Sequence, residues 1–572
     1  MRHAFLILVL PAALLAACAT VPSAVSSTDG DFGDGAGVTA YGLFLAGEGA
    51  LNDGRNRDAG AYFDRAAVDA DDGPLLRERA FTAALLSGEV SKAAALAPQG
   101  EEIADSTAQL GRLVIAVDAI ANGKGKLARE QLAGDTIAFP HRAAAVLLAP
   151  WAAATAGDLD SALVRPNVRG DRMVDFFGQY GQALLYERAK RYDEAETDFK
   201  ALMSGDAPAE MIVLDYGAFL ERRGRRADAI ALYDDALEKI PDSVAVRVAR
   251  SRADEKKSPP PMPSLRNGAA KVLLAPSATM ISAKQNQLAL AYLRLALRLN
   301  PDSDDAWLML GDVQTSDGDM EAARTAYAHT RPNSPEYQSA RAKLAWSYQN
   351  DKDSETALRL ARESAAGGGT DARLTLSDLL RANEKYEESG QILSQLISET
   401  KKPDWRLLYA RGVVYERLNR WPEAERDLEA ALKLEADEPE LLNYLGYSWI
   451  DRGLRLKEAM SMVERAVAAN PKSGAMTDSL GWAYYRLGDF KKAVEFLETA
   501  VELEAGEPEI NDHLGDAYWR VGRRDEAVFQ WRRVLTLDPP EKIRAAAEAK
   551  LKSGLGPDGP ASSPKIAEQS PR

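Results

Sequence analysis

Two stretches near the C-terminus decide the fold. Residues 478–493 read DSLGWAYYRLGDFKKA, and residues 512–527 read DHLGDAYWRVGRRDEA. They start 34 residues apart and share the order L-G-x-A-Y, followed at equal distances by a Gly and an Ala. A fixed period of this length indicates a repeat architecture, in which each unit buries its apolar face against its neighbours.

The final Ala of this pattern marks a frame that extends along most of the chain. Its positions follow one another at steps of 32 to 35 residues, apart from a single step of 60: Ala59, Ala93, Ala128, Ala162, Ala195, Ala229, Ala289, Ala323, Ala357, Ser389, Ala424, Ala459, Ala493 and Ala527. Bulky residues often stand four positions later and small ones seven positions later, which places both on one helical face. A Gly often stands twelve positions before the marker, and a Pro twelve positions after it ends the helix. The frame predicts fourteen pairs of antiparallel helices, an all-α solenoid.

The period and the small–large–small–Pro order resemble the tetratricopeptide repeat (TPR). The resemblance covers about residues 40–540, is clearest from residue 176 onward, and is weak between 74 and 170. Pro150 stands where the pattern has Gly or Ala, so we expect an irregular helix there. The resemblance implies a TPR superhelix whose first helices line a concave groove.

The 60-residue step predicts a division of the solenoid into two arms. It contains an additional helix over about residues 244–257 and then the proline-rich stretch SPPPMP at 258–263, which favours an extended connector. We expect an N-terminal arm of degenerate repeats (38–257), a linker (258–267) and a C-terminal arm (268–539). A capping helix (540–552) and a disordered tail (553–572) complete the expected organisation.

The N-terminus has the pattern of an export signal. A basic start precedes an apolar stretch over residues 4–15, which is too short to span a membrane as a helix. The stretch ends in LAAC at 15–18, which resembles the cleavage box of bacterial lipoproteins. This resemblance implies a signal peptide (1–17), lipidation of Cys18 and a flexible tether (18–37), and Ala19 in place of Asp implies the periplasmic face of the outer membrane. The alternative is an ordinary signal peptide with an incidental cysteine.

The composition argues against catalysis and against nucleic-acid binding. The net charge is −15, whereas nucleic-acid binding needs clustered positive charge. The single cysteine excludes an internal disulfide and a cysteine-based zinc site, and four histidines leave little for metal binding or acid–base catalysis. No phosphate-binding loop, nucleophile elbow or metal motif is present, and His141, His329 and His513 are interpreted as packing or surface residues. We expect no enzyme activity, no cofactor and no metal site.

Candidate binding residues follow from the TPR resemblance. In this family the groove is lined by set positions of the first helices, and in the last repeats these positions carry an aromatic and acidic set. The predicted groove residues are Tyr409, Glu416, Asn443, Tyr447, Asp478, Trp482, Tyr485, Asp512, Asp516 and Trp519. Ile450 occupies a further position of the same wall. The alternative is that Trp482, Tyr485 and Trp519 pack between repeats.

The sequence favours an outer-membrane interaction scaffold. Its C-terminal repeats resemble those of lipoprotein adaptors that dock periplasmic C-terminal processing proteases onto cell-wall hydrolases. An acidic groove favours a partner with a basic or amphipathic segment. The alternatives are a peptidoglycan- or polysaccharide-binding protein and an assembly factor for pili or outer-membrane proteins. The oligomeric state and the role of the N-terminal repeats are left open by the sequence.

Overall fold

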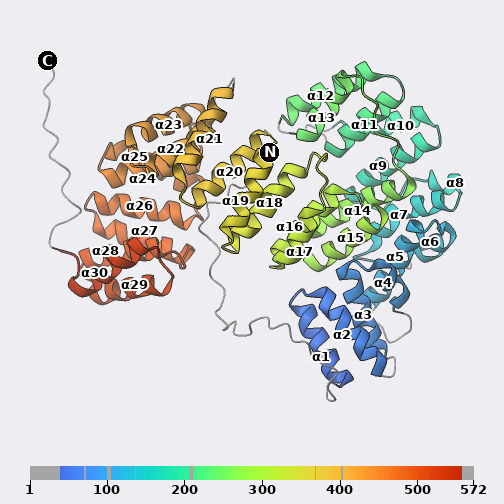
Figure 1. Cartoon of the computed structure of the whole chain (residues 1–572), viewed down its shortest axis with the longest axis horizontal. Coiled ribbons are helices and arrows are strands. Elements are labelled where there is room, and N and C mark those ends of the chain that lie inside the picture. The colour runs from blue at the N-terminus through green and yellow to red at the C-terminus, as the bar shows by residue number, and fades with distance from the viewer. Residues whose placement is uncertain are drawn as a thin grey trace. The chain divides into compact units, whose positions relative to one another are not determined.

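A computed structural model describes residues 39–69, 73–98, 105–134, 137–204, 210–241, 243–367, 369–400 and 404–556. Throughout these ranges every regular element is a helix (Figure 1). The predicted signal peptide, Cys18, the tether to residue 37 and the tail from residue 557 lie outside the described residues. None of the helices in the described ranges is long and apolar enough to cross a bilayer.

The helices form the predicted series of pairs. The first helices of the pairs are α1 (Ala40–Asn52), α3 (Pro74–Ser87), α5 (Asp105–Ala121), α7 (Arg142–Thr155), α9 (Arg172–Arg188), α11 (Glu210–Arg222), α14 (Leu265–Ser282), α16 (Asp304–Ser316), α18 (Tyr337–Asn350), α20 (Thr370–Ala382), α22 (Trp405–Arg417), α24 (Pro439–Arg452), α26 (Gly474–Arg486) and α28 (Pro508–Arg520). Their partners are α2 (Asn56–Asp69), α4 (Val90–Leu96), α6 (Gly125–Leu132), α8 (Leu159–Ala162), α10 (Tyr192–Leu202), α12 (Arg226–Lys239), α15 (Asn286–Leu299), α17 (Met320–Ala328), α19 (Ser354–Ala365), α21 (Tyr386–Glu399), α23 (Trp421–Leu434), α25 (Leu456–Ala469), α27 (Phe490–Leu503) and α29 (Arg524–Thr536). Two helices stand outside the pairs, α13 (Val244–Asp254) and α30 (Glu541–Ser553).

The marker residues explain why the pairs pack closely. All of them lie on the second helices, and each is 0% exposed. The Gly twelve positions earlier lies on the first helix, where its missing side chain makes room for the bulky residue of the second helix. A Cβ on Gly217 would lie 2.3 Å from the ring of Tyr233, and one on Gly515 would lie 2.5 Å from Nε1 of Trp531. The repeat signature is therefore a steric interlock between the two helices of a pair.

The irregular helix expected at Pro150 is not observed, and the early repeats are irregular in their second helices instead. The helix that contains Pro150 is helical from Arg142 to Thr155. The shortened elements are α4, α6 and α8, with 7, 8 and 4 residues, whereas the second helices of the last repeats have 13 or 14. The weak signature between residues 74 and 170 thus corresponds to truncated second helices.

The chain forms two compact units, and their boundary differs from the predicted one. The described residues 39–360 belong to one unit and 361–556 to the other, so the division falls within α19 and not in the proline-rich segment. In the first unit, α14 packs against α7 and α9, and α15 packs against α3 and α5. Helices on both sides of residues 258–267 therefore share one hydrophobic core.

The proline-rich segment is bound to the first unit. Arg188 donates a hydrogen bond to the carbonyl of Pro263 at 2.6 Å, and Arg222 donates one to the carbonyl of Pro260 at 2.9 Å. Both arginines belong to first helices, α9 and α11. The prediction of two arms joined by this linker is wrong because a sequence period carries no information on contacts between distant repeats. The surfaces of α3, α5, α7 and α9 are covered by a later repeat of the same chain.

Candidate partner-binding surface

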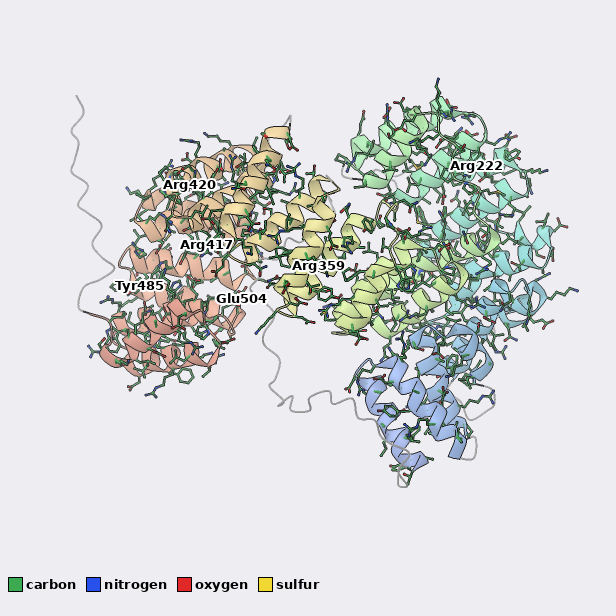
Figure 2. The ribbon with its side chains drawn as sticks, viewed as in Figure 1. Arg222, Arg359, Arg417, Arg420, Tyr485 and Glu504 are labelled. Atoms are coloured by element: carbon green, nitrogen blue, oxygen red, sulfur yellow. The ribbon has the colours of Figure 1, made fainter. Side chains whose placement is uncertain are left out.

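The predicted binding residues lie together on the first helices of unit 361–556. Tyr409 and Glu416 belong to α22, and the other eight belong to α24, α26 and α28. Steps of 34 and 35 residues bring Asn443, Asp478 and Asp512 to equivalent positions of successive first helices. We call the surface formed by these helices the first-helix surface. Figure 2 labels Tyr485 on it, and Glu504 in the same unit.

At the α22 end, the acidic residue is already neutralised. The Glu416 carboxylate pairs with the Arg452 guanidinium at 2.7 Å and accepts a hydrogen bond from the Tyr444 hydroxyl at 3.5 Å. The rings of Tyr409 and Tyr444 meet edge to face, with centroids 5.5 Å apart. Burial raises the pKa of Tyr409, and burial together with the Glu416 charge raises the pKa of Tyr444. Both tyrosines are therefore neutral phenols. This end offers aromatic contact area and little free charge.

An aromatic stack occupies the centre of the surface. The ring of Trp482 lies parallel to Tyr485, with centroids 4.6 Å apart, and parallel to His513, with centroids 4.0 Å apart. Tyr485 is buried and Trp482 is half-buried. Tyr485 therefore packs between repeats, as the alternative interpretation of the aromatic residues proposes, while Trp482 keeps an exposed edge.

His513, one of the three stacked rings, also forms a buried ion pair with Asp478. His513 Nδ1 lies 3.0 Å from both carboxylate oxygens of Asp478. Burial lowers the pKa of His513, but the charge and hydrogen bond of Asp478 and the charges of Glu509 and Asp512 outweigh it and raise the pKa to about 9. His513 is therefore an imidazolium at neutral pH, and Asp478 is compensated by it.

Tyr447 connects helices that are two repeats apart. Its hydroxyl on α24 donates to Glu509 Oε1 on α28 at 3.2 Å. Burial and the neighbouring charges of Glu509, Asp478 and Asp451 raise the pKa of Tyr447 far above its usual value. The half-buried Tyr447 ring thus stands as a neutral aromatic beside the stack.

Four buried side-chain atoms on the first helices of this unit lack hydrogen-bond partners within the described part of the chain: Asn443 Oδ1, Trp482 Nε1, Asn511 Oδ1 and Asp512 Oδ1. Oδ1 of Asn443 and Nε1 of Trp482 are both buried and make no hydrogen bond. Leaving a buried donor or acceptor unpaired costs about 1–3 kcal/mol. Buried polar groups in folded proteins are nearly always paired, so each unpaired atom requires an explanation.

The α28 end of the surface is covered by the chain itself. Lys550 Nζ on α30 lies 2.7 Å from the carboxylates of Asp512 and Asp516. Nε1 of Trp519 donates to the carbonyl of Leu555 at 3.1 Å, and its ring packs on Trp531 with centroids 5.3 Å apart. The expected capping helix is α30, and it neutralises two of the predicted acidic binding residues.

The structure therefore divides the predicted set. Tyr409, Asn443, Tyr447 and Trp482 remain half-buried on the first-helix surface. Of these four, Tyr447 is also hydrogen-bonded within the chain, to Glu509. The other six predicted residues are bonded to neighbouring side chains or to the backbone: Glu416, Asp478, Tyr485, Asp512, Asp516 and Trp519.

Sequence reasoning missed three residues that shape this surface. Tyr444 and His513 each follow a predicted binding residue, Asn443 and Asp512, at equivalent positions of two repeats. Both contribute rings to the first-helix surface. The 35-residue step between Asp478 and His513 was the available signal, because it brings an acid and a histidine onto facing helices. Lys550 lies beyond the last repeat, where the repeat frame gives no guidance.

Uncompensated acidic residues gather at the N-terminal ends of α24 and α28. Burial and the neighbouring Glu438 raise the pKa of Glu440. Burial and the charges of Glu504 and Glu509 raise the pKa of Glu507. In both cases burial is the larger cause, and the negative charges of neighbouring acids add to it. Among the described residues, no group of three or more His, Cys, Asp or Glu side chains is arranged to hold a metal ion.

Comparison with known proteins agrees with this architecture. Family models described as tetratricopeptide repeat match residues 180–244, 280–344, 405–437 and 478–506. The TPR repeat-containing protein PA4667 of Pseudomonas aeruginosa is 28% identical over 187 residues, which cover 32% of this chain and 32% of that protein. The match thus spans about a third of the relative's length.

Two solved structures are similar to parts of the chain at low TM-scores. The structure titled APC/C hetero-tetramer Cut9-Hcn1 covers 90% of this chain and 96% of its own, with 14% identity and a TM-score of 0.38. The thermophilic TPR protein TTC0263 of Thermus thermophilus covers 32% of this chain and 97% of its own, with 24% identity and a TM-score of 0.29. The family models alone show that tetratricopeptide repeats occur in both compact units of the chain.

Proposed function

We propose that the chain is a non-enzymatic scaffold that binds a protein partner on the first-helix surface of unit 361–556. TPR proteins generally act as protein–protein interaction scaffolds, and this supports the general role. The observation that supports the location is that two of the four unpaired buried atoms on these helices, Asn443 Oδ1 and Trp482 Nε1, belong to half-buried side chains that no other residue covers with an ion pair. A bound polypeptide offers an N–H donor for Asn443 Oδ1 and a carbonyl acceptor for Trp482 Nε1, once the side chains that cover these two buried atoms shift.

The aromatic residues and the charge favour a particular kind of partner. Tyr409, Tyr447 and Trp482 are half-buried on one surface, and Tyr and Trp are enriched at binding hot spots. The acidic residues beside them, Glu440 and Glu507, have no cation close enough to lower their pKa. We therefore expect a partner segment with apolar side chains flanked by Lys or Arg.

The proposed setting is the periplasmic face of the outer membrane. It rests on the LAAC box at 15–18 and on Cys18 as the single cysteine. Lipid chains on Cys18, followed by a tether rich in Ser, Gly and Asp, keep the repeats near the membrane while leaving them free to bind. A processing protease or a cell-wall hydrolase is the class of partner that we propose.

Crosslinked capture of the lipidated protein from its own cells tests this proposal. Trp482→Phe keeps an aromatic ring in the stack but removes the Nε1 donor, and Asn443→Leu removes the acceptor. Trp421→Phe is the matched control because Trp421 also carries an unpaired Nε1 but lies on the second helix α23. We expect one protease or hydrolase to be captured by the parent and the control, and lost in the double variant.

Ionic strength provides the second measurement. A charge-steered protein partner binds more weakly as salt rises, whereas stacking of a neutral sugar changes little.

In the capture experiment, equal capture by Trp482→Phe/Asn443→Leu and Trp421→Phe would place the binding site elsewhere. Enrichment of wall fragments without any protein would instead support the polysaccharide alternative.

A further inference from the structure

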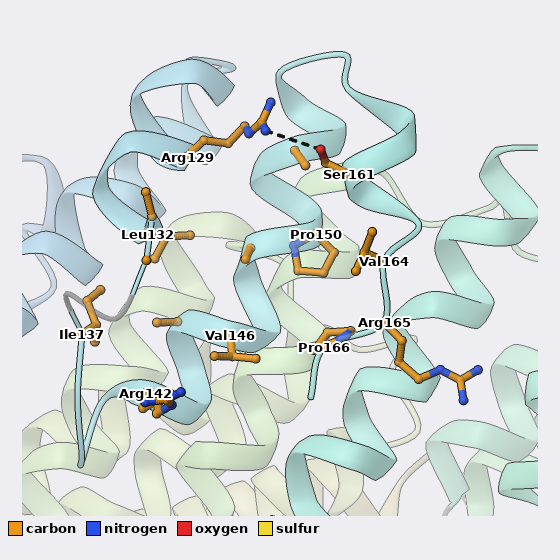
Figure 3. A pocket seen from close by; sticks show the side chains of 15 residues that line it. Arg129, Leu132, Ile137, Arg142, Val146, Pro150, Ser161, Val164, Arg165 and Pro166 are labelled. Carbon is orange, nitrogen blue, oxygen red and sulfur yellow. Dashed lines mark hydrogen bonds between the residues drawn. The ribbon is translucent and has the colours of Figure 1, made fainter. Parts of the chain in front are cut away.

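Prolines mark two places where unit 39–360 departs from the regular repeat. At the first, Pro150 and Pro166 line a cavity of about 380 Å³ between α6, α7 and α8, and both are buried (Figure 3). At the second, residues 258–263 (SPPPMP) lie outside any helix, and Pro260 and Pro261 are exposed. We call residues 258–263 the proline strap. The prolines of the cavity belong to the interior, whereas those of the strap face solvent.

The sequence of the strap indicates a polyproline II helix. Each proline holds φ at about −65°, and a residue that precedes a proline is restricted to extended conformations. Ser258 and Met262, the strap residues other than proline, each precede a proline. The peptide bonds before the strap prolines are trans, as this helix requires. A polyproline II helix has three residues per turn, so residues three positions apart share an edge.

Arginines from three helices bind one edge of the strap. The carbonyls that they bind are three positions apart, and each accepts a guanidinium hydrogen bond: Lys257 from Arg226 at 3.4 Å, Pro260 from Arg222 at 2.9 Å, and Pro263 from Arg188 at 2.6 Å. Figure 2 labels Arg222. One turn of polyproline II rises about 9 Å, which is close to the spacing of about 8–10 Å between packed helices. The interval of three therefore agrees with the conformation that the sequence indicates.

The other two edges of the strap are not bound by these arginines. Ser258 and Pro261 share one edge, and both are exposed. Their carbonyls accept no hydrogen bond from the described part of the chain. Pro259 and Met262 share the third edge and are half-buried. The strap thus presents proline rings and carbonyl acceptors to solvent in a conformation that the arginines already hold.

Basic side chains precede the strap. Lys256 is exposed and makes no ion pair with any described residue. Lys257 pairs with Glu255 at 2.6 Å, but the two side chains are 68% and 50% exposed, so the pair contributes little. A partner with acidic side chains beside its binding groove is therefore complementary to this end of the strap.

We propose that the proline strap is a docking ligand for a partner protein whose groove is lined by aromatic side chains and bordered by acidic ones. Such grooves bind polyproline II segments by packing aromatic rings on the prolines, and Tyr and Trp also donate hydrogen bonds. The strap is held in this conformation before binding, which lowers the entropic cost of docking. This inference is independent of the first-helix surface, which lies in the other compact unit.

A purified SH3 domain with acidic loops beside its aromatic groove is the probe. Isothermal titration calorimetry compares its binding to the full chain carrying Cys18→Ser and to a synthetic peptide of residues 256–264 (KKSPPPMPS). We expect the chain to bind the domain about fivefold more tightly than the peptide, because the peptide must still be ordered. Binding to the peptide alone, or to neither, overturns the proposal.

Variants of the chain test which part of the strap is bound. Pro260→Ala/Pro261→Ala removes the two exposed rings and is expected to weaken binding about tenfold. Pro332→Ala is the matched control, because Pro332 is exposed but lies outside the strap, and it leaves binding unchanged. Circular dichroism checks that both variants are folded. Unchanged binding in Pro260→Ala/Pro261→Ala overturns the proposal.

Two single substitutions separate charge from preorganisation. Lys256→Glu weakens binding at low salt and has a smaller effect at high salt, because exposed charges are screened. Arg188→Gln releases the carbonyl of Pro263, so the affinity falls toward that of the free peptide. Equal affinities of the parent chain, Arg188→Gln and the peptide would show that the arginines do not prepare the strap for binding, contrary to the proposal.

Discussion

The Tyr447 hydroxyl hydrogen-bonds to Glu509 at 3.2 Å, although the two residues are 62 positions apart in the chain. The bond joins α24 to α28 and so passes the intervening first helix α26. Successive first helices in this unit are also linked pairwise, by Arg486 to Asp451 at 3.2 Å and by Arg520 to Tyr485 at 3.2 Å. The aromatic surface is therefore held by polar bonds between repeats as well as by packing.

Tyr447→Phe removes the longer-range bond and keeps the ring. The bond is solvent-exposed, so we expect a loss of at most about 1 kcal/mol in the free energy of unfolding, measured by urea denaturation. Partner capture is expected to persist, because the aromatic contact area is unchanged. A loss of several kcal/mol would show that the bond organises the whole surface.

The Asp478–His513 pair makes stability depend on pH. The folded-state pKa of His513, about 9, is above its ordinary value of 6.5, so the imidazolium stabilises the fold fully below pH 6.5. This contribution, of the order of 1–3 kcal/mol, is lost as pH rises through 9. We expect the free energy of unfolding to fall between pH 6.5 and 9.

His513→Gln removes this pH dependence, since the titrating group is gone. His329→Gln serves as the control, because His329 is exposed and its ring nitrogen contacts only the carbonyl of Thr325 and the ring of Trp307. Parallel stability profiles for the parent and His513→Gln would rule out the pair as the source.

The steric interlock predicts opposite effects for two glycine substitutions. Gly217→Ala places a Cβ 2.3 Å from the buried Tyr233 ring, so the ring or the helices must shift, at a cost of about 1–3 kcal/mol. Gly60→Ala on α2 meets no atom within 4 Å and is expected to stabilise by about 0.5–1 kcal/mol through helix propensity. Thermal unfolding of the two variants, followed by circular dichroism, checks the difference in sign.

Lys550→Met tests the capping of the last repeat. It leaves Asp512 and Asp516 without their shared cation, and burial already raises the pKa of Asp516. Removing one partner of a buried ion pair costs about 3–5 kcal/mol. We expect faster amide hydrogen exchange in α28 to α30, and no change for Lys552→Met, whose side chain is exposed. Unchanged exchange in Lys550→Met would mean that packing alone closes this end.

Spacing in the sequence predicted the helix pairs because the interlock is local. Each marker Ala and its Gly partner lie within one repeat, and both kinds of position are buried as expected. The same spacing placed Trp482 and Tyr447 on one surface with Asn443. It could not show that Trp519 donates to Leu555 or that Lys550 reaches Asp512, because these contacts involve residues beyond the last repeat.

The unit boundary was mispredicted for a related reason. Consecutive prolines indicated an extended segment, and the segment is indeed free of helix between Glu255 and Ser264. Whether an extended segment separates two bodies depends on what it contacts, and here Arg188 and Arg222 bind it. Repeat signatures describe contacts between neighbouring repeats. This boundary depends instead on the repeat α14–α15, which packs on the much earlier helices α3, α5, α7 and α9.

That return of α15 onto α3 and α5 has a consequence for biosynthesis. Arg294 hydrogen-bonds to the carbonyl of Leu86 across 208 positions, and Arg298 reaches Asp118 across 180. A nascent chain that has released only α1 to α13 therefore exposes apolar surface that nothing yet covers, and exposed apolar surface of this kind aggregates or recruits chaperones. The apolar surface of α3 and α5 is covered only when α15 has emerged, so a chain interrupted before that point is a substrate for degradation and not a shorter working scaffold.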